Sequence, residues 1–315
     1  MEKIISKIHN SKSIAVLTHI NEDPDTLCSC FAFVKAVRAM GKTANIYVSG
    51  EIEKRISFIG NDYEIYNPDA QYEHDLCVCI DSGDLSRIGE RKKLFYEIGN
   101  TINIDHHYSN PCYADENYVD GDASSAGEII YRLLEQMNVE ITKEIATDLY
   151  TAICSDTGCF KYSNVSSKTM YTAGKLLEKD INNAEIARLL FDCESLTSVK
   201  IKAEATEKME SYYGGKVRCV SMTRDMYERY GVSEADAPNL VDIPRTVEET
   251  EIAICFKEQE GKIRISLRSN GACDVSLVAE KFGGGGHKKA AGCTIEGSAL
   301  DEIKGKVIKE CESLI

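Results

Sequence analysis

Hydrophobic positions in the first half of the chain form short unbroken apolar runs that alternate with longer segments of helical periodicity. The runs predict buried strands at Ser13–Thr18, Thr43–Val48, Asp75–Ile80 and Thr101–Ile104. The periodic segments predict helices at Leu27–Met40, Ser124–Met137 and Thr142–Cys154. Strands that are apolar throughout are typical of a parallel sheet covered by helices on both faces. We therefore expect an α/β fold, with a mainly parallel sheet flanked by helices in an N-terminal domain.

The pattern changes over residues 188–212, which are rich in charge and helical in period, and which we expect to form a helical linker. Beyond it, the apolar pattern predicts strands and helices of a smaller mixed α/β domain, at Lys216–Met222, Glu251–Lys257, Lys262–Ser269, Asp274–Phe282, Cys293–Ile295 and Leu300–Leu314. The expected organisation is an N-terminal domain over residues 1–187, the linker, and a smaller domain over residues 213–315.

Composition and charge narrow the class of protein. No stretch reaches the roughly 20 apolar residues that a membrane span needs, and the N-terminus lacks the features of a signal peptide, so we expect a cytoplasmic protein without membrane contact. The thirteen cysteines are scattered and are expected to be reduced. The net charge of −14 argues against binding to long duplex nucleic acid. Between Lys262 and Lys289, however, six Lys/Arg face only two acidic residues, which favours a small anionic substrate.

Acidic residues and histidines follow several of the predicted strands. His19, Asp23 and Asp25 follow the first strand, Asp81 follows the third, Asp105-His106-His107 ends the fourth, and Asp156 lies near the end of a helix. Strand ends of an open α/β sheet meet along one edge, so these residues should lie close together. Carboxylates in such proximity repel one another unless a cation neutralises them, and oxygen ligands with few imidazoles suit Mn²⁺ or Mg²⁺. The pattern predicts a two-metal hydrolase.

Some of these residues also have ordinary structural interpretations. Asp25 is a favoured helix cap, and an aspartate after a strand, such as Asp81, is common in turns. The adjacent pair His106-His107 is harder to explain, because buried imidazoles destabilise a fold unless each finds a partner.

A glycine-rich segment characterises the second domain. Gly283–Gly286 precede His287, Lys288 and Lys289, and Arg268-Ser269 lies upstream. Glycines let backbone N–H groups approach an anion, and the flanking cations favour the same ligand. The spacing does not match a Walker A loop. A flexible hinge is the alternative interpretation.

The motifs H-x₃-D-x-D, Asp81, Asp105-His106-His107, Asp156-Thr157-Gly158 and GGGGHKKAAG together resemble the DHH/DHHA1 phosphoesterase family over nearly the whole chain. Within the family, the chain is similar to the type that hydrolyses very short oligoribonucleotides and 3′-phosphoadenosine 5′-phosphate (pAp). The resemblance implies two divalent ions, Mn²⁺ first, with Mg²⁺ or Co²⁺ as other candidates. Two ions about 3.5–4 Å apart would activate a shared water for attack on phosphorus.

The resemblance also implies a role for each site residue. One ion would be held by His19, Asp23 and Asp81, and the other by Asp25, Asp81, His106 and Asp156, with Asp81 bridging. Asp105 would orient a histidine, and His107 would contact the scissile phosphate. Substrate would be bound by Arg268, Ser269, Gly284, Gly285, Gly286 and His287. The resemblance further implies that residues 1–187 form a catalytic domain, that residues 213–315 form a substrate-binding domain, and that the active site lies in the cleft between the two domains.

The chain departs from the family in the first motif, where Glu22-Asp23-Pro24-Asp25 replaces the usual Pro-Asp-Gly-Asp, and Cys28 stands where glycine is common. A phosphodiesterase for cyclic di-AMP or linear pApA would carry the same motifs and stays an alternative. A family II inorganic pyrophosphatase fits less well, because that group has a different second domain. A non-catalytic nucleotide-binding regulator would be expected to have lost a ligand, and every ligand is present. A homodimer stays open.

Overall fold

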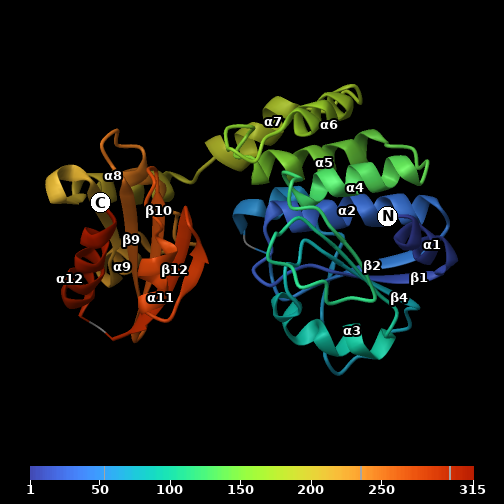
Figure 1. Cartoon of the computed structure of the whole chain (residues 1–315), viewed down its shortest axis with the longest axis horizontal. Coiled ribbons are helices and arrows are strands. Elements are labelled where there is room, and N and C mark those ends of the chain that lie inside the picture. Colours follow the sequence, from blue (N-terminus) through green and yellow to red (C-terminus); the bar gives the residue numbers. More distant parts are fainter. Residues whose placement is uncertain (53, 235, 298) are drawn as a thin grey trace. The chain divides into compact units, whose positions relative to one another are not determined.

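The computed structural model describes residues 1–52, 54–234, 236–297 and 299–315. The chain divides into two compact units, Met1–Cys193 and Glu194–Ile315 (Figure 1). Residues 188–212, where the sequence predicted a linker, are shared between the two units. The π-helical turn Arg188–Asp192 belongs to the first unit, and α8 (Leu196–Glu207) belongs to the second, where its Ile201 and Ala205 are fully buried.

The first unit contains a six-stranded parallel sheet, as the apolar runs predicted. Its order is β3-β2-β1-β4-β5-β6. The strands are β1 (Ser13–Leu17), β2 (Thr43–Val48), β3 (Glu64–Ile65), β4 (Leu76–Ile80), β5 (Thr101–Asp105) and β6 (Glu116–Val119). The order runs outward in both directions from the neighbours β1 and β4, and a topological switch point of this kind is where open α/β sheets bind ligands.

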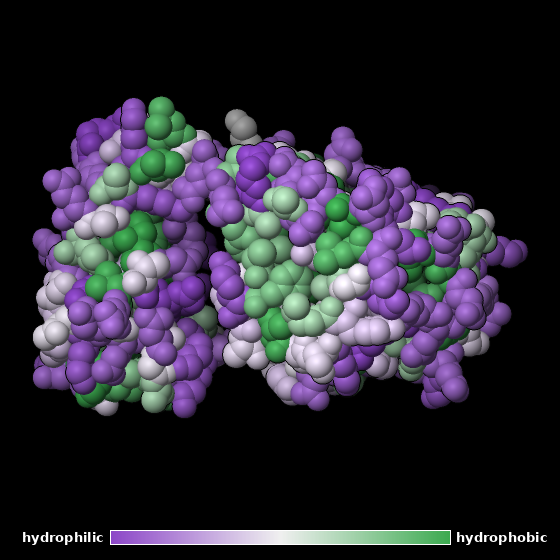
Figure 2. Space-filling model, turned by 90° about the horizontal axis from the view of Figure 1, so that it is seen from above, coloured by the Kyte–Doolittle hydropathy of each residue, from purple (hydrophilic) through white to green (hydrophobic). Residues whose placement is uncertain are grey.

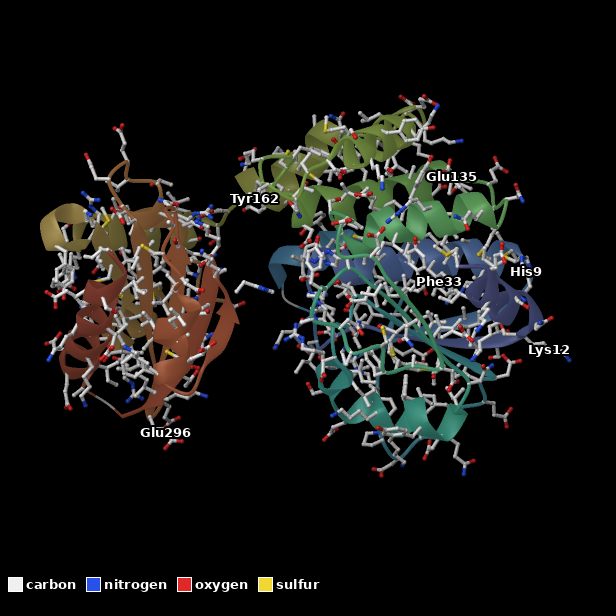
Figure 3. All side chains as sticks on the ribbon, viewed as in Figure 1. His9, Lys12, Phe33, Glu135, Tyr162 and Glu296 are labelled. Carbon is white, nitrogen blue, oxygen red and sulfur yellow. The ribbon has the colours of Figure 1, made fainter. Side chains whose placement is uncertain are left out.

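Helices cover both faces of this sheet, with α2, α4 and α5 on one side and α3 on the other (Figure 1). Helix α2 carries Phe33, which is fully buried in the core between the helices and the sheet and is labelled in Figure 3. The helices of the unit are α1 (Glu2–Asn10), α2 (Pro24–Ala39), α3 (Lys92–Ile98), α4 (Ala126–Gln136), α5 (Lys143–Asp156), α6 (Ser167–Leu177) and α7 (Asn183–Ala187), with 3₁₀ turns at Lys54–Ile59 and Leu85–Arg91.

The second unit contains a mixed sheet of order β11-β12-β10-β9-β8-β7, in which β8 and β9 are parallel and the other neighbours antiparallel. Its strands are β7 (Glu210–Tyr212), β8 (Val217–Met222), β9 (Ile252–Gln259), β10 (Lys262–Ser269), β11 (Gly285–His287) and β12 (Ala290–Glu296). Helices α11 (Ser276–Lys281) and α12 (Leu300–Cys311) pack in one core, and α8, α9 (Arg224–Tyr230) and α10 (Asp242–Arg245) contribute to another. The mixed α/β architecture confirms the predicted fold of this part of the chain.

The molecular surface is largely hydrophilic on the face shown in Figure 2, with apolar side chains in scattered patches. Helix α6 exposes Met170, Tyr171 and Leu177. Within the described part of the chain, no helix combines the length and apolar character that crossing a membrane requires.

Candidate metal centre

Acidic and histidine side chains from four separate segments converge beyond the carboxyl ends of β1, β4 and β5. Ligand-capable atoms within 4.8 Å of one another form three overlapping groups, His19/Asp23/Asp81, Asp25/His106/Asp156 and Asp81/His106/His107. The first group contains the residues expected for one ion, and the second contains three of the four expected for the other. The structure thus brings together all six candidate metal ligands predicted from the sequence.

The loop between β1 and α2 is shaped by the helix that follows it. Asp23 caps α2, because its Oδ1 accepts a hydrogen bond from the Thr26 backbone N–H at 3.1 Å, and Pro24 occupies the first helical position. The helix therefore begins three residues earlier than predicted. The capping residue is Asp23, not Asp25 as the ordinary interpretation of this motif assumed. The other carboxylate oxygen of Asp23 lies 3.4 Å from His19 Nε2.

His19 is buried and its ring orientation is defined by the backbone. Its Nδ1 lies 2.8 Å from the carbonyl oxygen of Ile20, which places the proton on Nδ1. Nε2 is then the nitrogen that faces Asp23 and Asp81, at 3.4 and 3.6 Å, and it would offer its lone pair to an ion. A histidine that binds metal commonly donates its second nitrogen to a backbone carbonyl in this way.

Asp25 is held by the N-terminus of another helix. Its Oδ2 accepts from the Ala126 N–H at 2.8 Å and its Oδ1 from the Gly127 N–H at 3.0 Å, both in the first turn of α4. Ser29 Oγ donates to Oδ1 as well. A helix N-terminus favours a negative charge, so α4 stabilises a carboxylate that burial would otherwise disfavour. The close approach requires Gly127, where a Cβ would lie 2.6 Å from that of Ala152.

Asp81 lies between the two histidines. It is 3 % exposed, with Oδ2 3.6 Å from His19 Nε2 and Oδ1 3.3 Å from His106 Nε2. Its backbone has φ of 59°, a left-handed conformation that few non-glycine residues adopt and that often marks a functional position. Oδ1 is buried and has no hydrogen-bond partner among the described residues. An unsatisfied buried carboxylate oxygen is what a bound cation would complete.

The two histidines after β5 point to different partners. His106 Nε2 lies 3.6 Å from Asp156, the last residue of α5, and 3.8 Å from Asp25. His107 Nδ1 lies 2.8 Å from Oδ1 of Asp105, and the second oxygen of Asp105 accepts from Asn110 Nδ2 at 2.6 Å. Asp105 is fully buried and is held by these two bonds, and it orients His107 so that Nε2 is the nitrogen left for a ligand.

The neighbourhood is electrostatically suited to cations. Burial opposes the charged imidazole, but the nearby carboxylates outweigh it and raise the pKa of His19 to about 10 and that of His106 to about 11. Burial, together with the neighbouring carboxylates, raises the pKa of Asp156 to about 7. Without a metal the histidines therefore retain protons that compensate the carboxylates. Four aspartates around two unprotonated imidazoles make a site of mostly hard oxygen ligands that fits divalent cations, Mn²⁺ and Mg²⁺ among them.

The loop that contains Glu22-Asp23-Pro24-Asp25 is held in place by a buried ion pair between Glu22 and Arg91. Glu22 accepts hydrogen bonds from Thr18 Oγ1 at 3.1 Å and from the Ser49 N–H at 2.6 Å, and its Oε1 lies 3.6 Å from Arg91. Arg91 is 1 % exposed and donates to Thr18 Oγ1 and to the Tyr47 carbonyl. The pair ties the loop that carries His19 and Asp23 to the end of β2.

We expect Arg91→Met to lower the free energy of unfolding by about 3–5 kcal/mol, because it leaves the buried Glu22 carboxylate without its cation. Urea denaturation measures the loss, and Arg188→Met, which removes an exposed pair with Glu185, should leave the unfolding free energy nearly unchanged. Adding Glu22→Gln to Arg91→Met should recover part of the loss. A decrease below about 1 kcal/mol, the range of surface pairs, would contradict a structural role for the buried pair.

The substrate-binding candidates all belong to the second unit. Arg268 lies on β10 and donates from Nη1 to its neighbouring Leu267 carbonyl, and exposed His287 ends β11. Ser269 is buried, and its backbone N–H donates to the Lys289 carbonyl at 3.0 Å.

The last two glycines of the run form, with His287, the edge strand β11, which pairs with β12 and which the sequence did not predict. At Gly284 and Gly286 a Cβ would lie within 2.6 Å of the backbone of β12. These two glycines are therefore required for close packing. Gly285 has no atom within 4 Å of such a Cβ and leaves its side of the backbone open.

Comparison with known proteins places these motifs in a family. The profile of the DHH family, N-terminal domain, matches residues 13–153, and the profile of the DHHA1 domain matches residues 196–313. A Streptococcus mutans protein named "Probable bifunctional oligoribonuclease and PAP phosphatase NrnA" is 30 % identical over 95 % of this chain and 94 % of its own. The chain belongs to the DHH family.

A second curated relative and one solved structure are also similar to the chain. The "Bifunctional oligoribonuclease and PAP phosphatase NrnA" of Thermus thermophilus is 29 % identical, over 94 % of this chain and 88 % of its own. Among solved structures, an exopolyphosphatase-related protein from Bacteroides fragilis has a TM-score of 0.93 at 23 % identity, and covers 99 % of this chain and 96 % of its own. That likeness shows the same two-domain fold in this member of the DHH family.

Proposed function

We propose that this DHH protein is a metal-dependent phosphoesterase that hydrolyses very short oligoribonucleotides and pAp. The observation that carries the proposal is the convergence of two histidines and three aspartates on buried Asp81, whose Oδ1 has no hydrogen-bond partner among the described residues. The converging residues are His19, His106, Asp23, Asp25 and Asp156. The names of the full-length relatives from Streptococcus mutans and Thermus thermophilus support the choice of substrates. The basic segment of the second unit supports an anionic substrate in a protein of net charge −14.

The metal ligands are assigned on the same geometry. His19, Asp23 and Asp81 would hold one ion, and Asp25, Asp81, His106 and Asp156 the other, with Mn²⁺ first and Mg²⁺ or Co²⁺ as other candidates. When bound, the ions would acidify a water nucleophile and neutralise charge on the phosphate.

The chain's own groups position the substrate beside these ligands. Asp105, anchored by Asn110, holds the His107 ring, and its hydrogen bond is the main cause that raises the pKa of His107. We assign His107 Nε2 as donor to the scissile phosphate. Arg268, Ser269, Gly284, Gly285, Gly286 and His287 are assigned to substrate binding, with Arg268 and His287 supplying charge-assisted hydrogen bonds. The thirteen free cysteines support a reducing, cytoplasmic location.

A product profile with Mn²⁺ tests the substrate assignment. We expect pAp and pApA to yield AMP, a five-nucleotide RNA to be shortened, and cyclic di-AMP to react more slowly than the linear substrates. Faster hydrolysis of cyclic di-AMP would favour the alternative of a cyclic-dinucleotide phosphodiesterase. Absence of hydrolysis of every nucleotide would refute the proposal.

In the same assay, Arg268→Ala should lower kcat/KM for nucleotides more than kcat/KM for bis-p-nitrophenyl phosphate, a small ester whose hydrolysis depends little on substrate binding. Mn²⁺ affinity, measured by calorimetry, should be unchanged, because Arg268 is outside the three ligand groups. Lys262→Ala, at the exposed start of the same strand, is the matched control. Equal losses on both kinds of substrate would contradict a separate recognition role for Arg268.

A further inference from the structure

Tyr108, which directly follows His107, presents an unusually open aromatic ring. The residue is 82 % exposed, which makes it the most exposed large hydrophobic side chain among the described residues. Its sequence neighbour His107 belongs to a ligand group with Asp81 and His106. A large ring in this place gains nothing from burial within the unit, so packing does not account for it.

Although exposed, the ring is fixed at both ends. The Tyr108 hydroxyl donates to Asp122 Oδ1 at 2.6 Å. The ring lies over Gly121 so closely that a Cβ there would be 2.5 Å from its Cδ1 and Cε1. Gly121 has no such atom, so the ring rests against backbone, and much of its conformational entropy is lost before any ligand arrives.

The support of this ring is part of the same loop that positions the candidate ligands. The Asp120 N–H donates to the Asp105 carbonyl at 3.0 Å, which joins the loop to the end of β5. Asp120 also pairs with Arg132 of α4 at 2.8 Å. A few residues on, the loop enters α4, whose first turn holds Asp25. The ring is therefore fixed relative to the centre, as a binding platform would need to be.

We propose that Tyr108 is a stacking platform for the nucleobase adjacent to the scissile phosphate, and this inference rests on the proposed nucleotide hydrolysis. An immobilised, exposed aromatic face is the feature on which proteins stack bases without selecting among them. A nucleotide carries its base and its phosphate in one residue, so a base on Tyr108 would accompany a phosphate beside His107. Such a platform would favour nucleotides over phosphate esters that lack a base, and would tolerate any of the four bases.

The absence of tryptophan from the chain allows a direct binding test. In Tyr108→Trp the introduced indole is the sole tryptophan, and we expect AMP to quench its fluorescence saturably while ribose 5-phosphate does not. Tyr96→Trp, at a 66 % exposed site on α3, is the matched control and should not respond. If the indole of Tyr108→Trp responds to neither compound, or equally to both, the proposal is overturned. Tyr162 also lies over a glycine, Gly158, and is therefore the rival position for a stacked base. If AMP quenches the fluorescence of Tyr162→Trp and not that of Tyr108→Trp, the proposal is also overturned.

Kinetics give a second, independent readout. Tyr108→Ala should raise KM for pApA about tenfold, the effect of losing one base stack, with a smaller change in kcat. Tyr108→Phe, which keeps the ring but loses the bond to Asp122, should fall between Tyr108→Ala and the native protein. Mn²⁺ affinity should be unchanged in both. An unchanged KM in Tyr108→Ala would overturn the stacking role of Tyr108. If the native protein still hydrolyses pApA, the proposed function stands, so failure of the stacking proposal is distinguished from failure of the proposed function.

Discussion

Asp81→Asn is expected to lower the rate of phosphoester hydrolysis by about three orders of magnitude or more. The two oxygens of Asp81 face His19 and His106, so its charge would contribute to both proposed ion sites at once. Asparagine has nearly the same shape and tolerates the left-handed backbone at this position, so the fold should be preserved. The measurement is kcat on pAp with saturating Mn²⁺, alongside circular dichroism to verify folding.

Asp84→Asn is the matched control for this variant. Asp84 lies three residues further in the same loop, and its Oδ1 accepts from the Ser86 N–H, a capping bond that asparagine can also make. Its rate should stay close to that of the native protein. If Asp81→Asn retained more than a tenth of native activity, the assignment of Asp81 as the bridging ligand would be wrong.

Removal of divalent cations is expected to abolish hydrolysis entirely, and Mn²⁺ should restore it better than Zn²⁺, because most ligands are hard carboxylate oxygens. Cation removal should also lower the midpoint of thermal unfolding, since the four clustered aspartates then repel one another with only histidine protons to compensate. An ion at one hundred times its dissociation constant stabilises the folded state by about 2.7 kcal/mol.

The experiment compares protein dialysed against EDTA with protein to which a single metal is returned, by activity and by calorimetric unfolding. Asp81→Asn should show a smaller stabilisation by Mn²⁺ than Asp84→Asn does. Full activity in a preparation shown to be free of metal would exclude the proposed chemistry.

The main strands could be predicted because each is a continuous apolar run. β2 matches its predicted bounds, and β1, β4 and β5 differ from theirs by one residue at one end. Four strands were not predicted. Two of them, β3 (Glu64–Ile65) and β7 (Glu210–Tyr212), are only two and three residues long. The other two, β6 and β11, were missed for different reasons. β6 (Glu116–Val119) is only half-buried and has no apolar run, and β11 consists largely of glycine, whose pairing with β12 depends on tertiary contact.

The site shows the same division between local and tertiary information. Because carboxyl ends of parallel strands share an edge, the proximity of His19, Asp81 and His106 could be inferred from where each strand ends. The hydrogen bonds from the N-terminus of α4 to Asp25 could not be inferred, because they join residues about a hundred positions apart. The ion pair of Glu22 with Arg91 gave no signal either, because a single glutamate and a single arginine form no recognisable motif.

The position of Asp156 at the end of α5 has a consequence for the newly made chain. The candidate ligands begin at His19 and are complete only at Asp156, so the whole of the sheet and both α4 and α5 must be synthesised before the centre can assemble. Domains generally fold as units while translation proceeds. A nascent chain emerging from the ribosome therefore carries no complete candidate metal centre until most of its first unit is outside the exit tunnel.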